Sequence, residues 1–139
     1  MNSRVIIICP IEGPSLFPDL IEEEAIGLCN ALNLDITETR TINLKRIHPA
    51  TYISKGHLED IKKSAQELEI DLVYIDTHIK PGQQRDLEKF LDCKVVDRTG
   101  LILEIFADRA TTQEGRIQVD LAYKNYQKSR LIRLWTHLE

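Results

Sequence analysis

Apolar residues in this chain gather in short continuous runs that alternate with longer amphipathic segments. The runs at 4–9, 72–76 and 95–97 are rich in β-branched residues and carry few charges. Such runs are typical of strands covered on both faces, as in a parallel sheet. Residues 36–44 alternate between apolar and polar side chains, and this pattern predicts one more strand.

The segments between these runs carry apolar residues at helical spacing. Helices are predicted at residues 18–32, with Pro18 in the first turn, and at 58–68, where the apolar positions form one stripe. Two shorter helices are predicted at 83–91 and 101–107. The alternation of strands and helices predicts an α/β fold with a four-stranded, mainly parallel sheet and flanking helices. Among the possible strand orders we favour 2-1-3-4.

A long amphipathic helix is predicted to follow the sheet and to leave it. Thr111 and Glu114 have the spacing of a capping box, a motif that starts helices. After Gly115 no proline or glycine interrupts the helical pattern. An apolar seam, with two lysines at its middle, runs along this helix as in one arm of a helical hairpin or coiled coil. The seam consists of Ile117, Leu121, Lys124, Lys128, Leu131, Trp135 and Leu138.

This seam has no second arm to pack against within the sequence. The final helix also has no C-cap signal such as a glycine. We therefore expect the 139 residues to be part of a longer protein. The predicted domains are an α/β domain at residues 1–110 and the start of a helical arm at residues 111–139.

Charge is distributed unevenly along the chain, whose formal net charge is −4. Residues 1–108 contain 12 Lys and Arg against 19 Asp and Glu, a balance of −7, whereas residues 109–139 contain 6 against 3, a balance of +3. A basic helix on an acidic body suggests a polyanionic partner, and a solvated helix face is the alternative. Hydrophobic residues at 42% and charged residues at 29% indicate a globular chain.

The three cysteines are widely spaced and form no C-x-x-C pair. An odd number at such spacing argues for a reducing compartment and against a disulfide framework or a zinc site. The first apolar run is too short for a secretory signal and meets Pro10, and no run approaches membrane-spanning length. A cytoplasmic protein without a membrane-spanning segment is therefore predicted.

The common catalytic motifs are absent from the sequence. It contains no Walker A sequence, no G-x-G-x-x-G and no G-x-S-x-G. The nearest approach to Walker A, Lys55-Gly56, has its two residues in the wrong order. The four histidines are scattered without metal-ligand spacing, so each is interpreted as a surface or packing residue.

Two aspartates stand at predicted strand ends. Asp76 ends the third strand and Asp97 ends the fourth, and ligands of open parallel sheets bind beyond the carboxyl ends of strands. The pair could hold a metal ion or orient a nucleotide, or each side chain could cap the helix or turn that follows. Arg98 and Arg109 could bind phosphate or pair with these acids.

Basic and aromatic side chains gather on the last helix. This mixture suits contacts with a nucleic-acid backbone and base stacking, and it equally suits a helical hairpin that buries its aromatic residues. Tyr123 and Tyr126 belong to the same helix. The candidate RNA-binding residues are Arg109, Arg116, Lys124, Lys128, Arg130, Arg133 and Trp135.

Residues 95–122 resemble, without a gap, the N-terminal domain of HflX-type GTPases, which are ribosome-associated GTP-binding proteins. The family pattern there is similar to V-x-D-R-x-x-L-I-L-x-I-F-A-x-R-A-x-T-x-E-G-x-x-Q-V-x-L-A. Residues 76–88 are similar to D-x-x-L-x-P-x-Q-x-R-x-L-E, and residues 135–139 to W-x-H-L-E. The resemblance covers most of the chain from Tyr52 onward, whereas residues 1–50 match only in layout.

The resemblance implies an α/β domain and a two-helix arm that bind the large ribosomal subunit and its rRNA, in a protein involved in ribosome splitting or rescue. GTP and Mg²⁺ would bind in a GTPase domain outside this chain, which itself would hold no cofactor and no catalytic residue. The expected partners are the large subunit and that GTPase domain. The chain departs from the family pattern at Ser54-Lys55-Gly56-His57, where the family often has G-x-G-K. The motif that would bind a nucleotide at this loop is therefore incomplete.

Two other functions stay open from the residues alone. One is a small α/β enzyme domain that binds a nucleotide or a metal through Asp76 and Asp97. The other is a module that dimerises through the helical seam between Ile117 and Leu138.

Overall fold

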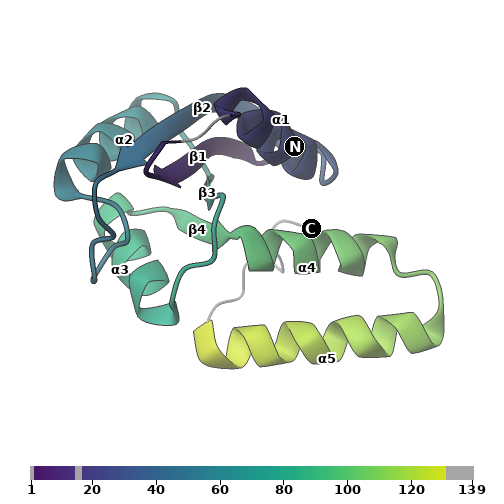
Figure 1. Cartoon of the computed structure of the whole chain (residues 1–139). Helices are drawn as coiled ribbons and strands as arrows, with labels where there is room; N and C mark the ends of the chain where they lie inside the picture. Colours follow the sequence, from purple (N-terminus) through teal and green to yellow (C-terminus); the bar gives the residue numbers. More distant parts are fainter. Residues whose placement is uncertain (1, 15–16, 131–139) are drawn as a thin grey trace.

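Residues 2–14 and 17–130 are described in the structure, a computed structural model. Four parallel strands form one sheet in the order β2-β1-β3-β4 (Figure 1). The predicted fold class and strand order are therefore confirmed. The strands are β1 (Arg4–Glu12), β2 (Asp35–Leu44), β3 (Leu72–Ile75) and β4 (Lys94–Asp97).

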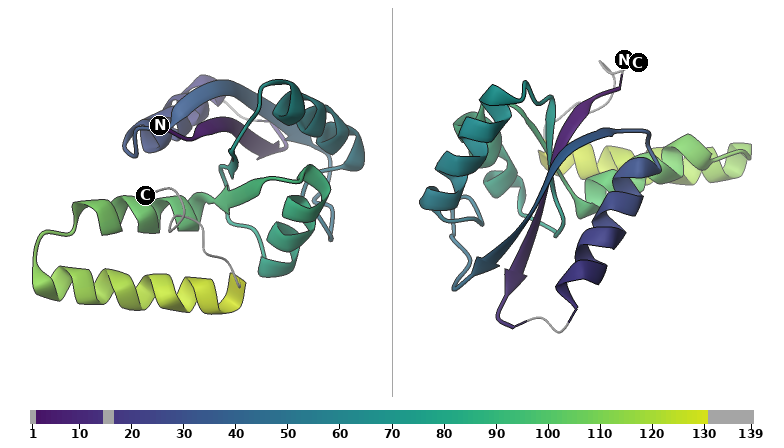
Figure 2. Two further views of the ribbon diagram at one scale, coloured as in Figure 1. Left: turned by 180° about the vertical axis from the view of Figure 1, so that it is seen from behind. Right: turned by 90° about the horizontal axis from the view of Figure 1, so that it is seen from above.

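Helices cover both faces of the sheet (Figure 2). α2 and α3 pack on one face, and α1 and α4 pack on the other. Within the described ranges, no helix combines the length and the apolar character that crossing a lipid bilayer requires. The helices are α1 (Pro18–Asn30), α2 (Lys55–Glu67), α3 (Pro81–Leu91), α4 (Arg98–Arg109) and α5 (Gln113–Arg130).

The core is organised around β1, which lies between β2 and β3. Its residues from Val5 to Cys9 have no exposed surface. Since side chains alternate along a strand, Ile6 and Ile8 pack with α2 and α3, whereas Val5, Ile7 and Cys9 pack with α1 and α4. The continuous apolar run thus supplies two cores, one on each face of the sheet.

β1 is longer than predicted, because it continues through Pro10 to Glu12. The pairing of β1 with β3 ends at Ile8 and Ile75, whereas its pairing with β2 continues to Glu12 and Leu44. Proline has no N–H to donate and is therefore confined to strand positions that need no donor on one side. Pro10 lies beyond the last β1–β3 pair, so the predicted end of the strand at Cys9 is wrong.

α4 is also longer than predicted. The expected polar turn at residues 98–100 is the first turn of this helix, and the helix continues to Arg109 instead of ending at residue 107. Asp97 causes the early start because its Oδ1 accepts a hydrogen bond from the Gly100 N–H over 3.0 Å, as an N-cap does.

α5 takes a different path from the one predicted. It begins at Gln113, where Thr112 rather than Thr111 is the cap, since Thr112 Oγ1 accepts from the Gly115 N–H over 3.0 Å. Figure 1 shows α5 returning antiparallel to α4 toward the sheet, and its end lies beside α3. Over its described length the helix therefore lies along the domain instead of leaving it, because buried Tyr126 joins the core under α4.

Candidate functional site

Asp76, Asp97 and Arg98 lie together at the carboxyl edge of the sheet. β3 and β4 are parallel neighbours, and Ile75 pairs with Asp97 across them. Asp76 directly follows β3, Asp97 is the last residue of β4, and Arg98 is the first residue of α4. The two strand ends thus bring Asp76 to Arg98, which lies 22 positions away in sequence.

Burial and two hydrogen bonds determine the environment of Asp76, whose side chain is 4% exposed. Tyr74 donates its hydroxyl hydrogen to Asp76 Oδ1 over 2.6 Å, and Arg98 Nη1 donates to the same oxygen over 3.1 Å. Burial raises the pKa of Asp76, and the Tyr74 hydrogen bond and the Arg98 charge offset part of this rise. Burial and the bond to Asp76 also raise the pKa of Tyr74, so the phenol stays a neutral donor.

Arg98 connects this edge of the sheet to α1. Its Nη2 atom pairs with Glu24 of α1, while Nη1 pairs with Asp76. The hydrogen bond with Glu24 raises the pKa of Arg98, so the guanidinium keeps its charge. Both ends of the planar guanidinium are thus engaged by carboxylates of the protein, a geometry that arginine suits better than lysine.

Asp97 is fully buried and holds three other parts of the chain. Its Oδ1 accepts from the Gly100 N–H over 3.0 Å and from the Tyr126 hydroxyl over 2.9 Å, and its Oδ2 accepts from the Ile79 N–H over 3.1 Å. His78 Nδ1 lies 3.4 Å from Oδ2. One carboxylate therefore caps α4 and fixes both the β3–α3 loop and α5.

These contacts bear on the two roles that the sequence leaves open for the aspartates. Asp97 caps the helix that follows it, and Asp76 pairs with Arg98. Both carboxylates thus accept hydrogen bonds from the protein itself, and no group of three or more His, Cys, Asp or Glu in the described part of the chain is arranged to hold a metal ion. Burial raises the pKa of Cys9 and Cys29 nearby to about 12, so neither is an activated nucleophile. The arrangement is suited to joining elements.

Three residues of this cluster are not predicted from the sequence. They are Tyr74, Glu24 and, in its role as the partner of Asp97, Tyr126. Tyr74 leaves a usable signal, because residues two apart in a strand share a face and Tyr74 precedes Asp76 by two. Glu24 and Tyr126 leave no such signal. Their contacts with Arg98 and Asp97 span 74 and 29 positions and depend on the packing of α1 and α5.

The basic candidates for RNA binding are spread along α4 and α5. Arg109 ends α4 and is exposed, and Arg116 is exposed in the first turns of α5, where its Nε donates to the Ala110 carbonyl over 3.2 Å. Lys124 is exposed two turns further along α5. Lys128 and Arg130 belong to the last described turns of this helix. Arg133 and Trp135 lie outside the described residues.

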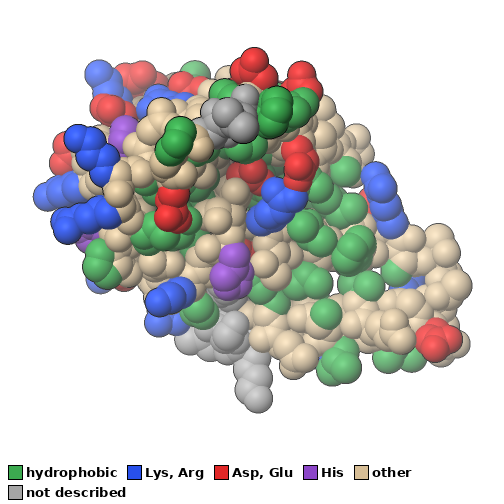
Figure 3. All heavy atoms as spheres, in the orientation of Figure 1, with side chains coloured by type: hydrophobic (Ala, Val, Ile, Leu, Met, Phe, Trp, Pro, Cys, Tyr) green, Lys and Arg blue, Asp and Glu red, His purple; other side chains and the backbone are tan. Residues whose placement is uncertain are grey.

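Hydrophobic side chains gather over the α4–α5 hairpin (Figure 3). Phe106 of α4 is 55% exposed, and the seam residues Ile117 and Leu121 of α5 are each 61% exposed. Between the two helices lies a cavity of about 470 Å³, lined mainly by apolar side chains. Its lining residues are Leu103, Phe106, Arg109, Ala110, Gly115, Gln118, Val119 and Ala122.

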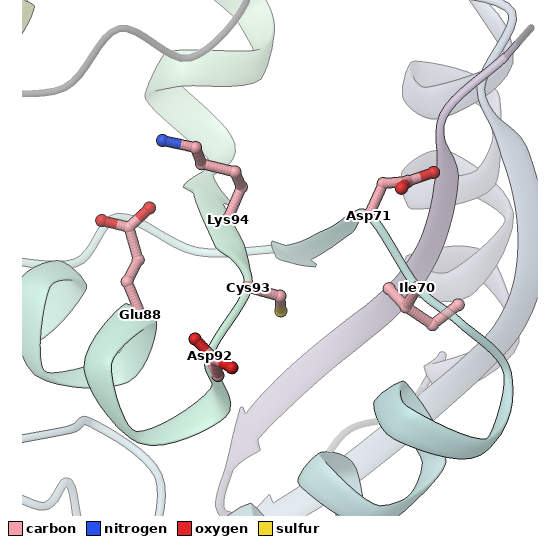
Figure 4. A pocket seen from close by; sticks show the side chains of 6 residues that line it. All are labelled: Ile70, Asp71, Glu88, Asp92, Cys93 and Lys94. Carbon is pink, nitrogen blue, oxygen red and sulfur yellow. The ribbon is translucent and has the colours of Figure 1, made fainter.

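A second cavity, of about 490 Å³, lies at the opposite edge of the sheet, between the ends of β3, α3 and β4 (Figure 4). Three of its six lining residues are acidic, Asp71, Glu88 and Asp92, and Lys94 is basic. Glu88 Oε2 accepts from the Val95 N–H over 3.1 Å, and burial raises its pKa. Burial likewise raises the pKa of Cys93 to about 12. Glu88 thus secures the start of β4.

The Ser54–His57 segment forms the start of α2. It stands where HflX-type proteins often have G-x-G-K. A smaller cavity of about 290 Å³ lies beside it, and its lining includes Lys45, Arg46 and His57. The segment provides helix N–H groups but no glycine pair, and Gly56 has open space around the position of a Cβ atom.

Comparison with known proteins identifies the relatives of this chain. GTPase HflX of Magnetococcus marinus is 49% identical over 117 residues, which are 84% of this chain and 27% of that protein. GTPase HflX of Lacrimispora saccharolytica is 49% identical over 145 aligned residues, which cover 99% of this chain and 33% of that protein. The chain thus spans about a quarter to a third of the curated relatives that it matches.

A solved structure has the same fold over almost the whole chain. It is a GTP-binding protein from the archaeon Sulfolobus solfataricus in complex with GDP, with a TM-score of 0.70 and 26% identity. The alignment covers 94% of this chain and 38% of that protein.

The fold defines the class of protein, an α/β domain with a helical extension that is similar to part of a GTP-binding protein. The model of the family described as GTP-binding GTPase N-terminal matches residues 21–107. The chain belongs to this family, and the resemblance to HflX-type GTPases found in the sequence is confirmed.

Proposed function

We propose that the chain is the N-terminal, ribosome-binding domain of a cytoplasmic HflX-like GTPase that acts in ribosome splitting or rescue. The observation that carries this proposal is the 49% identity to GTPase HflX over most of the chain. The partner would be the large ribosomal subunit, through its rRNA.

The GTPase activity itself would belong to another part of the full-length protein. GTP and Mg²⁺ would bind there, and that GTPase domain would be the second partner of this chain. The small share of the relatives that the chain covers supports this division of roles. Within the chain, residues 1–110 would form the α/β domain and residues 111–139 the start of the arm.

The charge and exposure of α5 support RNA as the partner. Arg109, Arg116 and Lys124 are exposed and lie along one hairpin. Cationic side chains that neutralise phosphates make binding strongly dependent on salt. Tyr126 is buried, so it is not available for base stacking.

The exposed seam supports a further helix as the second arm. Ile117 and Leu121 present apolar surface that α4 does not cover. A following helix of the full-length protein would bury them in a hairpin. A second copy of the chain could cover the same face, and sedimentation at increasing concentration distinguishes these cases, because only self-association raises the mass.

The proposal is tested by binding the chain to purified large ribosomal subunits at a series of salt concentrations. We expect the variant with Arg116→Gln and Lys124→Gln to bind more weakly and to show a smaller salt slope, by about one unit per phosphate contact removed. The matched control, with Lys63→Gln and Arg85→Gln, also removes two exposed positive charges but from α2 and α3. Equal loss in both variants, or no binding at low salt, would contradict the proposal.

A further inference from the structure

Within its described residues, α5 buries little side-chain surface against the rest of the chain. Among its described side chains, Tyr126 alone is buried, with 8% of its surface exposed. Between three and four turns of helix precede it, and there Ile117 and Leu121 face solvent. A helix with so little buried surface gains little stability from packing and can open separately from the core.

An apolar groove that is open to solvent runs between α4 and α5. The cavity of about 470 Å³ lies between these helices and is lined by Leu103 and Phe106 on one side and Val119 and Ala122 on the other. The groove is open to solvent, so these side chains leave part of their apolar surface in water instead of burying it between the helices. Apolar packing along the hairpin is therefore a weak restraint on α5.

The strong restraint is polar and lies at the carboxyl edge of the sheet. The Tyr126 hydroxyl donates to Asp97 Oδ1 over 2.9 Å, inside a site where Asp97 is completely buried. A hydrogen bond to a buried carboxylate is stronger than a neutral one at the surface. It joins α5 to the end of β4, and so to the sheet.

Gly100 makes this contact possible. A Cβ atom at Gly100 would lie 2.6 Å from the Tyr126 hydroxyl oxygen and 2.8 Å from Val96 Cγ2. Real side chains do not approach so closely, so the first turn of α4 must carry a glycine for Tyr126 to reach Asp97. The backbone of Gly100 donates to the same carboxylate oxygen.

The connection between α4 and α5 has the form of a hinge. Ala110 is extended, with φ −68° and ψ 115°, and Thr111 and Thr112 are exposed. A few such residues between two helices can absorb a change in direction.

We propose that the Tyr126–Asp97 hydrogen bond is a latch that fixes the direction of α5. When the latch opens, α5 detaches from the sheet about residues 110–112, and without that support its helical hydrogen bonds open more often, while the sheet stays folded. The latch would set the direction in which the cationic helix is presented. The hydrogen bond lies within the chain and forms without a ribosome. A test of the latch can therefore fail while ribosome binding is observed, and the reverse.

Hydrogen–deuterium exchange with mass spectrometry tests the latch in the full chain. Tyr126→Phe removes only the hydroxyl group. We expect exchange in peptides covering residues 113–126 to rise about tenfold, since losing one such hydrogen bond changes an equilibrium by about that factor. Exchange in β1 and β3 should not change. Unchanged exchange in α5, or an equal rise in the sheet, would overturn the proposal.

Two matched controls separate the latch from general effects of substitution. Tyr52→Phe removes a tyrosine hydroxyl that donates to Glu12 at the surface, and α5 should exchange as in the unchanged chain. Gly27→Ala and Gly100→Ala both add a methyl group within a helix, but only Gly100 meets neighbours within 3.0 Å. Faster exchange of α5 in Gly100→Ala and not in Gly27→Ala supports the latch, and the same response in both contradicts it.

Discussion

β1 and α5 are held in place by different physical means. The five residues from Val5 to Cys9 of β1 have no exposed surface, and both faces of the strand pack into apolar clusters. Among the described side chains of α5, Tyr126 alone is buried, and its hydroxyl is bonded to a carboxylate. Apolar burial stabilises without specifying direction, whereas a buried hydrogen bond has a fixed geometry. The strand is therefore fixed by buried apolar area, whereas the buried anchor among the described side chains of α5 is a polar contact.

Thiol reactivity should show the largest difference between the two regions. Burial raises the pKa of Cys9 to about 12, from an ordinary value of 9.0. Since the thiolate is the reacting form, Cys9 should react with iodoacetamide at pH 8 about a thousandfold more slowly than a cysteine introduced by Leu121→Cys, at a position that is 61% exposed. Peptide mass spectrometry over time gives both rates. Similar rates would mean that Cys9 is as accessible to the reagent as an exposed position on α5.

Two isoleucines provide the matching test of stability. Ile7 is completely buried in β1, whereas Ile117 in α5 is 61% exposed. We expect Ile7→Ala to lower the free energy of unfolding by about 4 kcal/mol, because it leaves a cavity in a packed core. Ile117→Ala should change it by no more than about 0.5 kcal/mol. Urea denaturation followed by circular dichroism measures both, and a large loss in Ile117→Ala would show that the seam is covered.

The sheet was predictable from the sequence because each strand carries its own signal. The apolar runs and their alternation with helices give the fold class, whereas the strand order is not given by the sequence, and the favoured order 2-1-3-4 is the one observed. The end of β1 was not predictable, because the position of Pro10 relative to β3 depends on how far β3 extends. Local pattern therefore determines the elements, and pairing partners determine their ends.

The candidate site was predictable only in part. Strand ends bring Asp76 and Asp97 to one edge, and this follows from the sequence. The partner of Asp97 does not follow, since Tyr126 reaches it only after α5 folds back along α4. The helix cap shows the same limit, because the capping-box spacing with Glu114 favours Thr111 whereas the folded backbone uses Thr112.

Removing the Asp97 carboxylate should lower the free energy of unfolding by less than the cavity left by Ile7→Ala. Asp97→Ala deprives the N–H groups of Ile79 and Gly100 and the hydroxyl of Tyr126 of this acceptor. We expect a loss of about 3 kcal/mol, which combines a lost N-cap with poorly satisfied buried donors. Asp71→Ala is the control, because Asp71 also accepts a backbone hydrogen bond but is exposed. Equal losses in urea denaturation would contradict the special role of Asp97.

The smallest expected effect is a dependence on pH at Asp76. Burial raises its pKa in the folded chain above the ordinary value of 3.8. A group with a raised folded pKa binds more protons in the folded than in the unfolded state just above that value, so its contribution to stability increases as pH falls and is lost as pH rises through the folded pKa. The stability of the unchanged chain, relative to Asp76→Asn, should therefore increase as pH is lowered from 7 toward 4. Urea denaturation across that range measures the difference, and Asp86→Asn, at an exposed position on α3, should show no such trend. If the stability of the unchanged chain relative to Asp76→Asn decreased as pH is lowered, the attraction of Arg98 would outweigh burial at this edge of the sheet.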